Sequence, residues 1–314
     1  MKHNRIITVG FAPAWDVTCS AAGLDWGDHV PVDQRMVPAG KALNVSKALA
    51  WLGHPSMAMG LWGQEDRPQL ASAQTLLGPA VDIRMTFVPG RTRLNLTVVD
   101  TSRRREMHLR APSTLATAAA LDRLMTDILP RLDAPCTVVF SGALPEGDLQ
   151  GKALDIVAVA RRAGAHCVAD SAGTVLQAML QQGRLHLIKP NLEELREWLS
   201  APVPNNPPAI MDAIRSLENP VDIALVSRGK EGALVVTADE AWSAQVTGED
   251  HPVVNTVACG DYLLAGFLAG PEDEPLPRRI QRAVQVATAR ARGWTDRPLD
   301  QALFPPVDVQ AVAG

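Results

Sequence analysis

Short apolar runs alternate with longer segments of helical periodicity along most of this chain. Runs such as Ile6–Gly10, Thr137–Phe140 and Ile223–Val226 have the length of buried strands. In the segments between them, for example 149–163 and 174–181, apolar residues recur every three or four positions and a glycine follows within two residues. Repeated strand–helix units predict a mainly parallel sheet with helices on both faces, which is a three-layer α/β/α fold.

Two regions alternate with a period of two instead, at 17–37 and at 83–110. The strands expected at 83–88 and 92–99 are separated by Pro89-Gly90, which predicts a β-hairpin, and a further ribbon follows at 106–110. The second strand has an apolar and a polar face: Leu94, Leu96 and Val98 against Arg93 and Asn95. Such ribbons suit a lid over a cleft, or alternatively an edge sheet. We expect one α/β domain over 1–314, with a small β-lid from about 12–37 and 84–112.

Composition excludes several classes of function. The chain has 314 residues and a formal net charge of -4, and it lacks a long basic run, which disfavours a nucleic-acid partner. No apolar segment is long enough to span a membrane, and the first apolar run is too short for a signal peptide. The four cysteines lack metal-ligand spacing, which predicts reduced thiols in a cytoplasmic protein: Cys19, Cys136, Cys167 and Cys259.

The stretch 256–268 is the most informative for chemistry. Ala258, Cys259 and Gly260 precede an apolar helical run, so their amides are expected at a helix N-terminus, where they attract anions such as phosphate. Asp261 lies in the first turn, placed to take a proton from a hydroxyl group beside that anion. The alternative is that Asp261 only complements the helix dipole.

Polar residues elsewhere lie at helix starts and at strand ends. Gly40 precedes a helix on which Lys41 and Asn44 are one turn apart, and this pair can hold a sugar hydroxyl or a phosphate. Asp16 and a set of later residues follow expected strands, at the edge where α/β folds bind ligands: Ser141, Asp170, Lys189, Asn191 and Ser227. Each is also a common turn or capping residue.

Six motifs in order resemble the PfkB (ribokinase-like) family of carbohydrate kinases, in particular its 1-phosphofructokinase and tagatose-6-phosphate kinase branch. The matching segments span nearly the whole chain: Pro-Ala-Trp-Asp at 13–16, Ala-Gly-Lys-Ala-Leu-Asn-Val at 39–45, Thr-Arg-Leu-Asn at 92–95, Ser-Gly-Ala-Leu-Pro at 141–145, Lys-Pro-Asn-Leu-Glu-Glu at 189–194, and Thr-Val-Ala-Cys-Gly-Asp-Tyr at 256–262. The resemblance implies a ribokinase-like fold and an ATP- and Mg²⁺-dependent kinase acting on a phosphorylated ketohexose of the fructose-1-phosphate or tagatose-6-phosphate type.

The resemblance also implies a role for each matched residue. Asp261 would be the base, and the amides of Ala258, Cys259 and Gly260 would form the anion hole. The sugar would contact Asp16, Gly40, Lys41, Asn44 and Asn95, with Arg93 on its phosphate. The ATP side would comprise Lys189, Ser227, Gly229 and Gly232, with Asn191 and Glu194 organising Mg²⁺ largely through water. The lid strands would join two copies into a homodimer.

The chain departs from the family pattern near the expected chemistry. Alanine replaces glycine at 39, 42 and 258, Ala12 replaces an asparagine, Ala143 replaces a serine, and Tyr262 replaces a small residue. Two interpretations therefore stand: an active sugar-phosphate kinase, and a ligand-binding or regulatory protein with a degenerate kinase site.

Overall fold

The computed structural model describes residues 5–313 except 134, 172, 220, 249–251 and 255. Its strands form a 10-stranded sheet of order β14-β13-β12-β11-β10-β9-β8-β1-β4-β5 and a 4-stranded sheet of order β3-β2-β6-β7. The large sheet is parallel from β11 to β5, and β12, β13 and β14 extend it with antiparallel pairing. A mainly parallel sheet is thus confirmed.

The strands and helices have the following bounds. The strands are β1 (Arg5–Gly10), β2 (Ala14–Ala21), β3 (Asp33–Ala39), β4 (Ser56–Gly63), β5 (Val81–Val88), β6 (Leu94–Asp100), β7 (Arg105–Arg110), β8 (Cys136–Ser141), β9 (His166–Asp170), β10 (Leu187–Ile188), β11 (Ile223–Ser227), β12 (Ala233–Val236), β13 (Ala241–Val246) and β14 (Val307–Ala311). The α-helices are α1 (Lys41–Trp51), α2 (Arg67–Ala73), α3 (Ala118–Ile128), α4 (Leu149–Arg162), α5 (Gly173–Gln181), α6 (Leu192–Leu199), α7 (Pro207–Arg215), α8 (Cys259–Leu268) and α9 (Leu276–Ala291).

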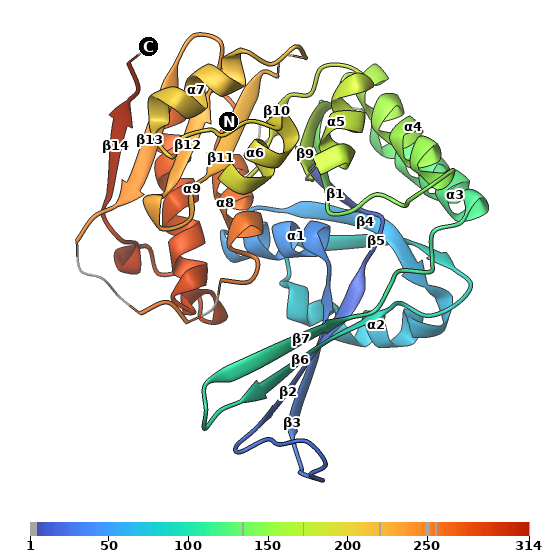
Figure 1. Ribbon diagram of the computed structural model, residues 1–314. Coiled ribbons are helices and arrows are strands. Elements are labelled where there is room, and N and C mark those ends of the chain that lie inside the picture. The colour runs from blue at the N-terminus through green and yellow to red at the C-terminus, as the bar shows by residue number, and fades with distance from the viewer. Residues whose placement is uncertain are drawn as a thin grey trace.

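Two hydrophobic cores lie on opposite faces of the large sheet. On one face, residues such as Val138 and Ile188 pack against α3, α4, α5, α6 and α7. On the other, the neighbouring residues Val139 and Leu187 pack against α1, α8 and α9. Successive side chains of a strand point to opposite faces, so a strand buried on both sides carries a continuous apolar run. The result is the expected three-layer α/β/α arrangement (Figure 1).

The small sheet extends away from the three layers (Figure 1). The prediction of a hairpin between the strands at 83–88 and 92–99 is wrong. In the structure β5 pairs in parallel with β4 in the large sheet, whereas β6 pairs with β2 and β7 in the small sheet. The lid therefore consists of β2, β3, β6 and β7, and residues 84–88 do not belong to it. Alternating patterns look alike at the edge of either sheet, so periodicity alone could not assign β5.

In the part of the chain that the structure describes, the helices are all too short or too polar to cross a lipid bilayer.

Candidate active site

Buried charges converge at the carboxyl ends of β8, β9 and β10. Asp170 ends β9, and its Oδ1 lies 3.1 Å from Nζ of Lys189, which follows β10, and 3.7 Å from Nζ of Lys41 on α1. Ser141, which ends β8, donates a 2.8 Å hydrogen bond to Asp170 Oδ2. Parallel strands end at one edge, which is why residues far apart in sequence meet here.

Asp261 faces this cluster from the first turn of α8. Its side chain is buried, and its Oδ2 accepts a 2.8 Å hydrogen bond from Nδ2 of Asn44 on α1. Gly260 lets a cation approach the same turn, because a Cβ on that residue would lie 3.1 Å from Lys189 Nζ. The first amides of a helix have no partner within it, so the turn combines backbone donors, a lysine and a carboxylate.

The two buried carboxylates have opposite ionisation behaviour. Burial, together with the negative charge of Asp170, raises the pKa of Asp261 to about 7, although Asn44, Lys189 and Lys41 act in the opposite direction. Burial also disfavours the charged form of Asp170, but Lys189, Lys41 and Ser141 outweigh it and lower the pKa of that carboxyl group. The low pKa keeps Asp170 an anion, whereas the pKa of Asp261 lies near neutral pH, in the range that suits a general base.

Ala258 is the N-cap of α8, and its backbone is left-handed, with φ 68° and ψ 4°. An L-residue with a Cβ costs about 1–2 kcal/mol in this conformation, which glycine adopts freely. The amide of Cys259 donates a 3.3 Å hydrogen bond to the Thr256 carbonyl, so this turn is closed on itself and that amide is directed inward. The anion hole that was expected from three amides therefore lacks the amide of Cys259.

The other departures from the family pattern carry no backbone strain. The non-glycine residues with positive φ in the described chain are Arg104, Ser200 and Ala258, so Ala39 and Ala42 are unstrained. Tyr262 is buried beside Trp51, with ring centroids 6.5 Å apart, and Thr295 hydrogen-bonds its side chain. Its ring thus packs between α1 and the region after α9, as a core residue.

The lid presents a polar face with Asp16 and Asn95. These two residues are in register on β2 and β6, and Asn95 Nδ2 donates a 2.9 Å hydrogen bond to Asp16 Oδ1. Arg110 lies opposite Asn95 on β7 and so shares this face. The polar face therefore offers a carboxylate, an amide and a cation.

Arg93 lies immediately before β6 and binds backbone. Its guanidinium donates to the carbonyls of Ala12 (3.0 Å), Pro13 (3.2 Å) and Ala111 (2.9 Å), which occupies three of its five N–H groups. Burial and the nearby Arg110 lower its pKa. Arg93 fixes the junction of the lid with the large domain, and two of its donors remain for a ligand.

Asn191 and Glu194 form a capping box at the start of α6. The Asn191 side chain accepts from the Glu194 amide at 2.8 Å, and Glu194 Oε2 accepts from the Asn191 amide at 2.8 Å. Ser227 is bridged to Asn191 at the end of β11. The turn after β11 needs Gly232, at φ 80°, where a Cβ would lie 2.0 Å from the Ala244 carbonyl oxygen. Gly229 also lies in this turn. The start of α6, with Asn191 and Glu194, and the turn after β11, with Ser227, Gly229 and Gly232, therefore lie side by side near Lys189.

Three charged residues near the site carry no specific sequence signal. The sequence marks Asp170 only as one of several polar strand ends, and its ion pairs depend on the sheet topology. Arg290 Nε donates a 3.0 Å hydrogen bond to the Val257 carbonyl, directly before the left-handed turn. Arg110 is placed beside Asn95 only by the register of β6 and β7. No local motif marks any of the three.

Comparison with known proteins shows the family of the chain. The model of the pfkB family carbohydrate kinases matches residues 24–293. The chain is 30% identical over 313 residues to 1-phosphofructokinase of Escherichia coli (strain K12), and the match covers 98% of each chain.

Solved structures with the same fold include phosphofructokinase-2 from Escherichia coli. The complex of that enzyme with fructose-6-phosphate has a TM-score of 0.82, with 22% identity and coverage of 94% of this chain and 98% of that one. The tetrameric inhibited form of the same enzyme has a TM-score of 0.82, with 23% identity and the same coverage. At this identity the likeness establishes the ribokinase-like fold.

Proposed function

The chain belongs to the pfkB family of carbohydrate kinases, and we propose that it transfers the γ-phosphoryl group of ATP to a hydroxyl of a phosphorylated ketohexose, of the fructose-1-phosphate or tagatose-6-phosphate type. Membership makes it a phosphotransferase with an alcohol acceptor. The observation that carries the finer proposal is Asp261, a buried carboxylate with a pKa of about 7 in the first turn of α8.

Asp261 acts as the general base in this proposal. Its ionised form takes the proton of the acceptor hydroxyl, and Asn44 holds the carboxylate in place through its 2.8 Å hydrogen bond. A base with a pKa near the working pH combines a useful ionised fraction with adequate proton affinity. Burial keeps that affinity high, and the neighbouring Asp170 adds to it because a second negative charge disfavours ionisation of Asp261.

The transferred phosphoryl group is stabilised beside the same turn. The amides of Ala258 and Gly260 at the start of α8 supply donors, and Lys189 supplies a positive charge that Asp170 holds in place at 3.1 Å. Burial disfavours the charged ammonium, but Asp170 and Asp261 outweigh it and raise the pKa of Lys189, so the lysine remains protonated. Fixed donors and charges of this kind stabilise developing negative charge without reorganisation.

Kinases of this family use ATP and Mg²⁺, and the residues at the edge of β10 and β11 fit both. Glu194 has one carboxylate oxygen outside the capping box, and oxygen ligands with retained water are what Mg²⁺ prefers. Bound Mg²⁺ would neutralise charge on the nucleotide phosphates. The turn with Ser227, Gly229 and Gly232 would lie along the nucleotide, because it adjoins Asn191 at the ligand edge of the sheet.

The sugar would lie between this edge and the polar face of the lid. Asp16 and Asn95 would bind its hydroxyls from the lid, with Gly40 and Lys41 at the start of α1. Arg93 and Arg110 would bind the phosphate already on the substrate. Neither arginine forms an ion pair within 4.0 Å in the described chain, so both can pair with an anionic ligand.

An ADP-release assay across a panel of substrates tests the proposal. We expect turnover with at least one ketohexose phosphate, and much weaker turnover with the corresponding unphosphorylated sugar. The Asp261→Asn protein is the control for contaminating kinases. No turnover on any sugar phosphate or free sugar, with ATP or sugar binding retained by calorimetry, would indicate a binding protein instead.

We further propose that two copies join through the apolar face of the lid. Leu96 opposes Leu109 and Val98 opposes Met107 across β6 and β7, so these four share a face with Leu94. Leu94, Met107 and Leu109 are 52%, 46% and 49% exposed, and an exposed apolar sheet face of this kind is typical of a protein–protein interface.

Sedimentation velocity tests the homodimer. Leu109→Glu should convert a dimer to monomers, whereas Leu303→Glu, at an equally exposed leucine far along the chain, should leave the dimer intact. A wild-type monomer, or a dimer unaffected by Leu109→Glu, would refute the lid interface.

A cytoplasmic location is part of the proposal. None of the four cysteines forms a disulfide in the described part of the chain, which suits a reducing compartment. Fractionation of the native host with an antibody to the chain would test it.

A further inference from the structure

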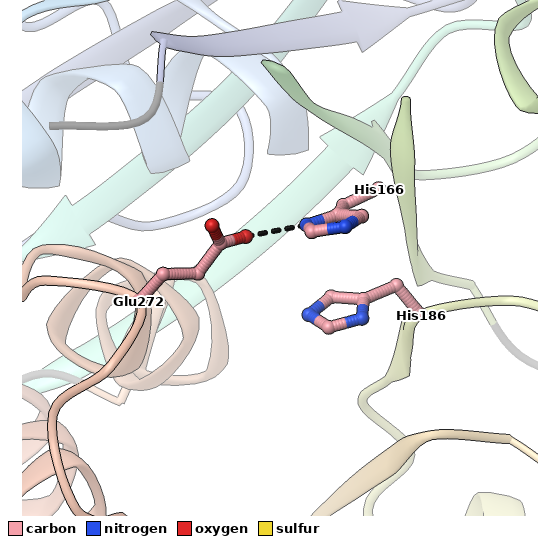
Figure 2. Close-up of side chains that lie close together, drawn as sticks. All are labelled: His166, His186 and Glu272. Carbon is pink, nitrogen blue, oxygen red and sulfur yellow. Dashed lines mark hydrogen bonds and ion pairs between the residues drawn. The ribbon is translucent and has the colours of Figure 1, made fainter. Parts of the chain in front are cut away.

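Three side chains outside the kinase site lie close together (Figure 2), at the amino ends of β9 and β10 and after α8. His166 is the first residue of β9, His186 directly precedes β10, and Glu272 follows α8. Their ligand atoms all lie within 4.8 Å of one another. His166 Nδ1 is hydrogen-bonded to Glu272 Oε1, and the two imidazole rings stack with centroids 4.3 Å apart. From this geometry we propose a transition-metal site, formed by His166, His186 and Glu272, that binds Zn²⁺.

The donor set suits Zn²⁺ better than Mg²⁺. Imidazole nitrogen and carboxylate oxygen are common zinc ligands, and three protein ligands plus water complete a tetrahedral site, whereas Mg²⁺ prefers oxygen alone. Tetrahedral ligands at about 2.0–2.1 Å from the ion lie roughly 3.4 Å apart. His166 and Glu272 are 44% and 47% exposed, so their side chains can move the short distance required.

A carboxylate outside the cluster orients His186. Asp222 Oδ2 lies 3.1 Å from His186 Nδ1, which leaves Nε2 as the atom available to a metal. Arg184 in turn holds Asp222. In zinc sites the ring nitrogen that does not bind the metal commonly donates a hydrogen bond to a carboxylate, which fixes the orientation of the ring.

A cation on α9, Arg279, lines the same small cavity as His186 and Glu272. The nearby Arg279 is held by the Phe267 carbonyl at 3.3 Å and lies over the Phe267 ring at 4.1 Å. Zinc would replace the proton between His166 and Glu272, and that proton would be released to solvent.

The proposed site shares its supporting elements with the kinase site. β9 carries His166 at one end and Asp170 at the other, about 13 Å away at the rise of a strand. His186 and Lys189 likewise flank β10. Asp261 lies in the first turn of α8, and Glu272 lies beyond its last residue, Leu268. A bound metal would therefore tie together the three elements that position the catalytic charges, and it should stabilise the fold.

Calorimetric titration of the EDTA-treated full-length protein with ZnCl₂, in excess Mg²⁺, tests the site. We expect one Zn²⁺ per chain at micromolar affinity, and Co²⁺ should give the visible absorption of tetrahedral coordination. Zinc at 100-fold above its Kd should raise the Tm by about 4 °C. His186→Ala and Glu272→Gln should each abolish binding, and Asp222→Asn should weaken it about 10–100-fold.

The lid provides a matched control. His108 and Glu106 form another histidine–glutamate pair, at 3.2 Å, without a second imidazole, so His108→Ala should leave zinc binding unchanged. Glu272→Gln changes an exposed turn and should fold normally, which retained kinase activity without zinc would verify. Absence of zinc binding by the wild-type protein, or binding unaffected by His186→Ala and Glu272→Gln, would overturn the proposal.

Discussion

Asn44 Nδ2 donates a 2.8 Å hydrogen bond to Oδ2 of Asp261, and this bond joins the first helix of the chain to the helix that carries the proposed base. Asp261→Asn should lower kcat about 10²–10⁴-fold, because an amide cannot accept the hydroxyl proton. The protein should still fold and bind ATP, which circular dichroism and calorimetry would check. Turnover near the wild-type value would remove Asp261 from its role as base.

The raised pKa of Asp261 predicts a pH dependence of activity. The base must be ionised, so kcat should rise with pH and level off above about 7. The profile should be measured at saturating substrate, with the buffer kept at constant ionic strength. A rate that is flat between pH 5 and pH 8 would contradict this assignment.

The same pKa predicts a change in stability. A carboxyl group with a folded-state pKa above its unfolded value binds more protons when folded, so its contribution to the free energy of unfolding falls as pH rises from about 4 to about 7. Asp261→Asn removes this loss and should stabilise the protein at pH 8 by on the order of 1–3 kcal/mol relative to wild type. Urea unfolding of both proteins at pH 5 and pH 8 would show the difference. A variant that loses stability relative to wild type between those pH values would contradict the direction.

Arg93→Ala should raise the KM for a sugar phosphate about thirtyfold or more, since a lost buried charge–phosphate contact costs about 2–5 kcal/mol. The KM for the corresponding free sugar should change little. Arg91→Ala is the matched control, because Arg91 is exposed and paired with Glu65 at 2.7 Å. Equal effects of Arg93→Ala on both substrates would show that Arg93 only supports the lid junction through its three carbonyl contacts.

Ala258→Gly should relieve the strain of the left-handed residue before α8. We expect an unchanged or raised free energy of unfolding, because the gain of about 1–2 kcal/mol exceeds the entropy cost of glycine. The freed turn should also raise kcat, since the loss of one donor from an oxyanion-type hole lowers kcat about 10²–10³-fold. Ala119→Gly, at an exposed position in the first turn of α3, relieves no strain and should instead be destabilising, by at most about 1 kcal/mol. A destabilised Ala258→Gly protein with unchanged kcat would show that the alanine is harmless.

Local sequence determined much of this protein. The apolar runs of β8, β9 and β11 and the helical periodicity of α4 fixed the parallel α/β core, because a strand buried on both faces must be apolar throughout. Short motifs also placed Asp261 in the first turn of a helix, since small residues before an apolar helical run mark an N-terminus.

Tertiary structure decided which of those residues meet. Asp170 and Lys189 form their 3.1 Å pair only because β9 and β10 are neighbours in the sheet, and pairing order is not encoded in local periodicity. For the same reason the sequence pattern wrongly assigns residues 84–88 of β5 to the lid, since an alternating strand can join either sheet. The pKa of Asp261 depends on burial and on Asp170, and the left-handed backbone of Ala258 is evident only in the folded turn. Sequence supplied the chemical groups, and packing set their distances, charges and strain.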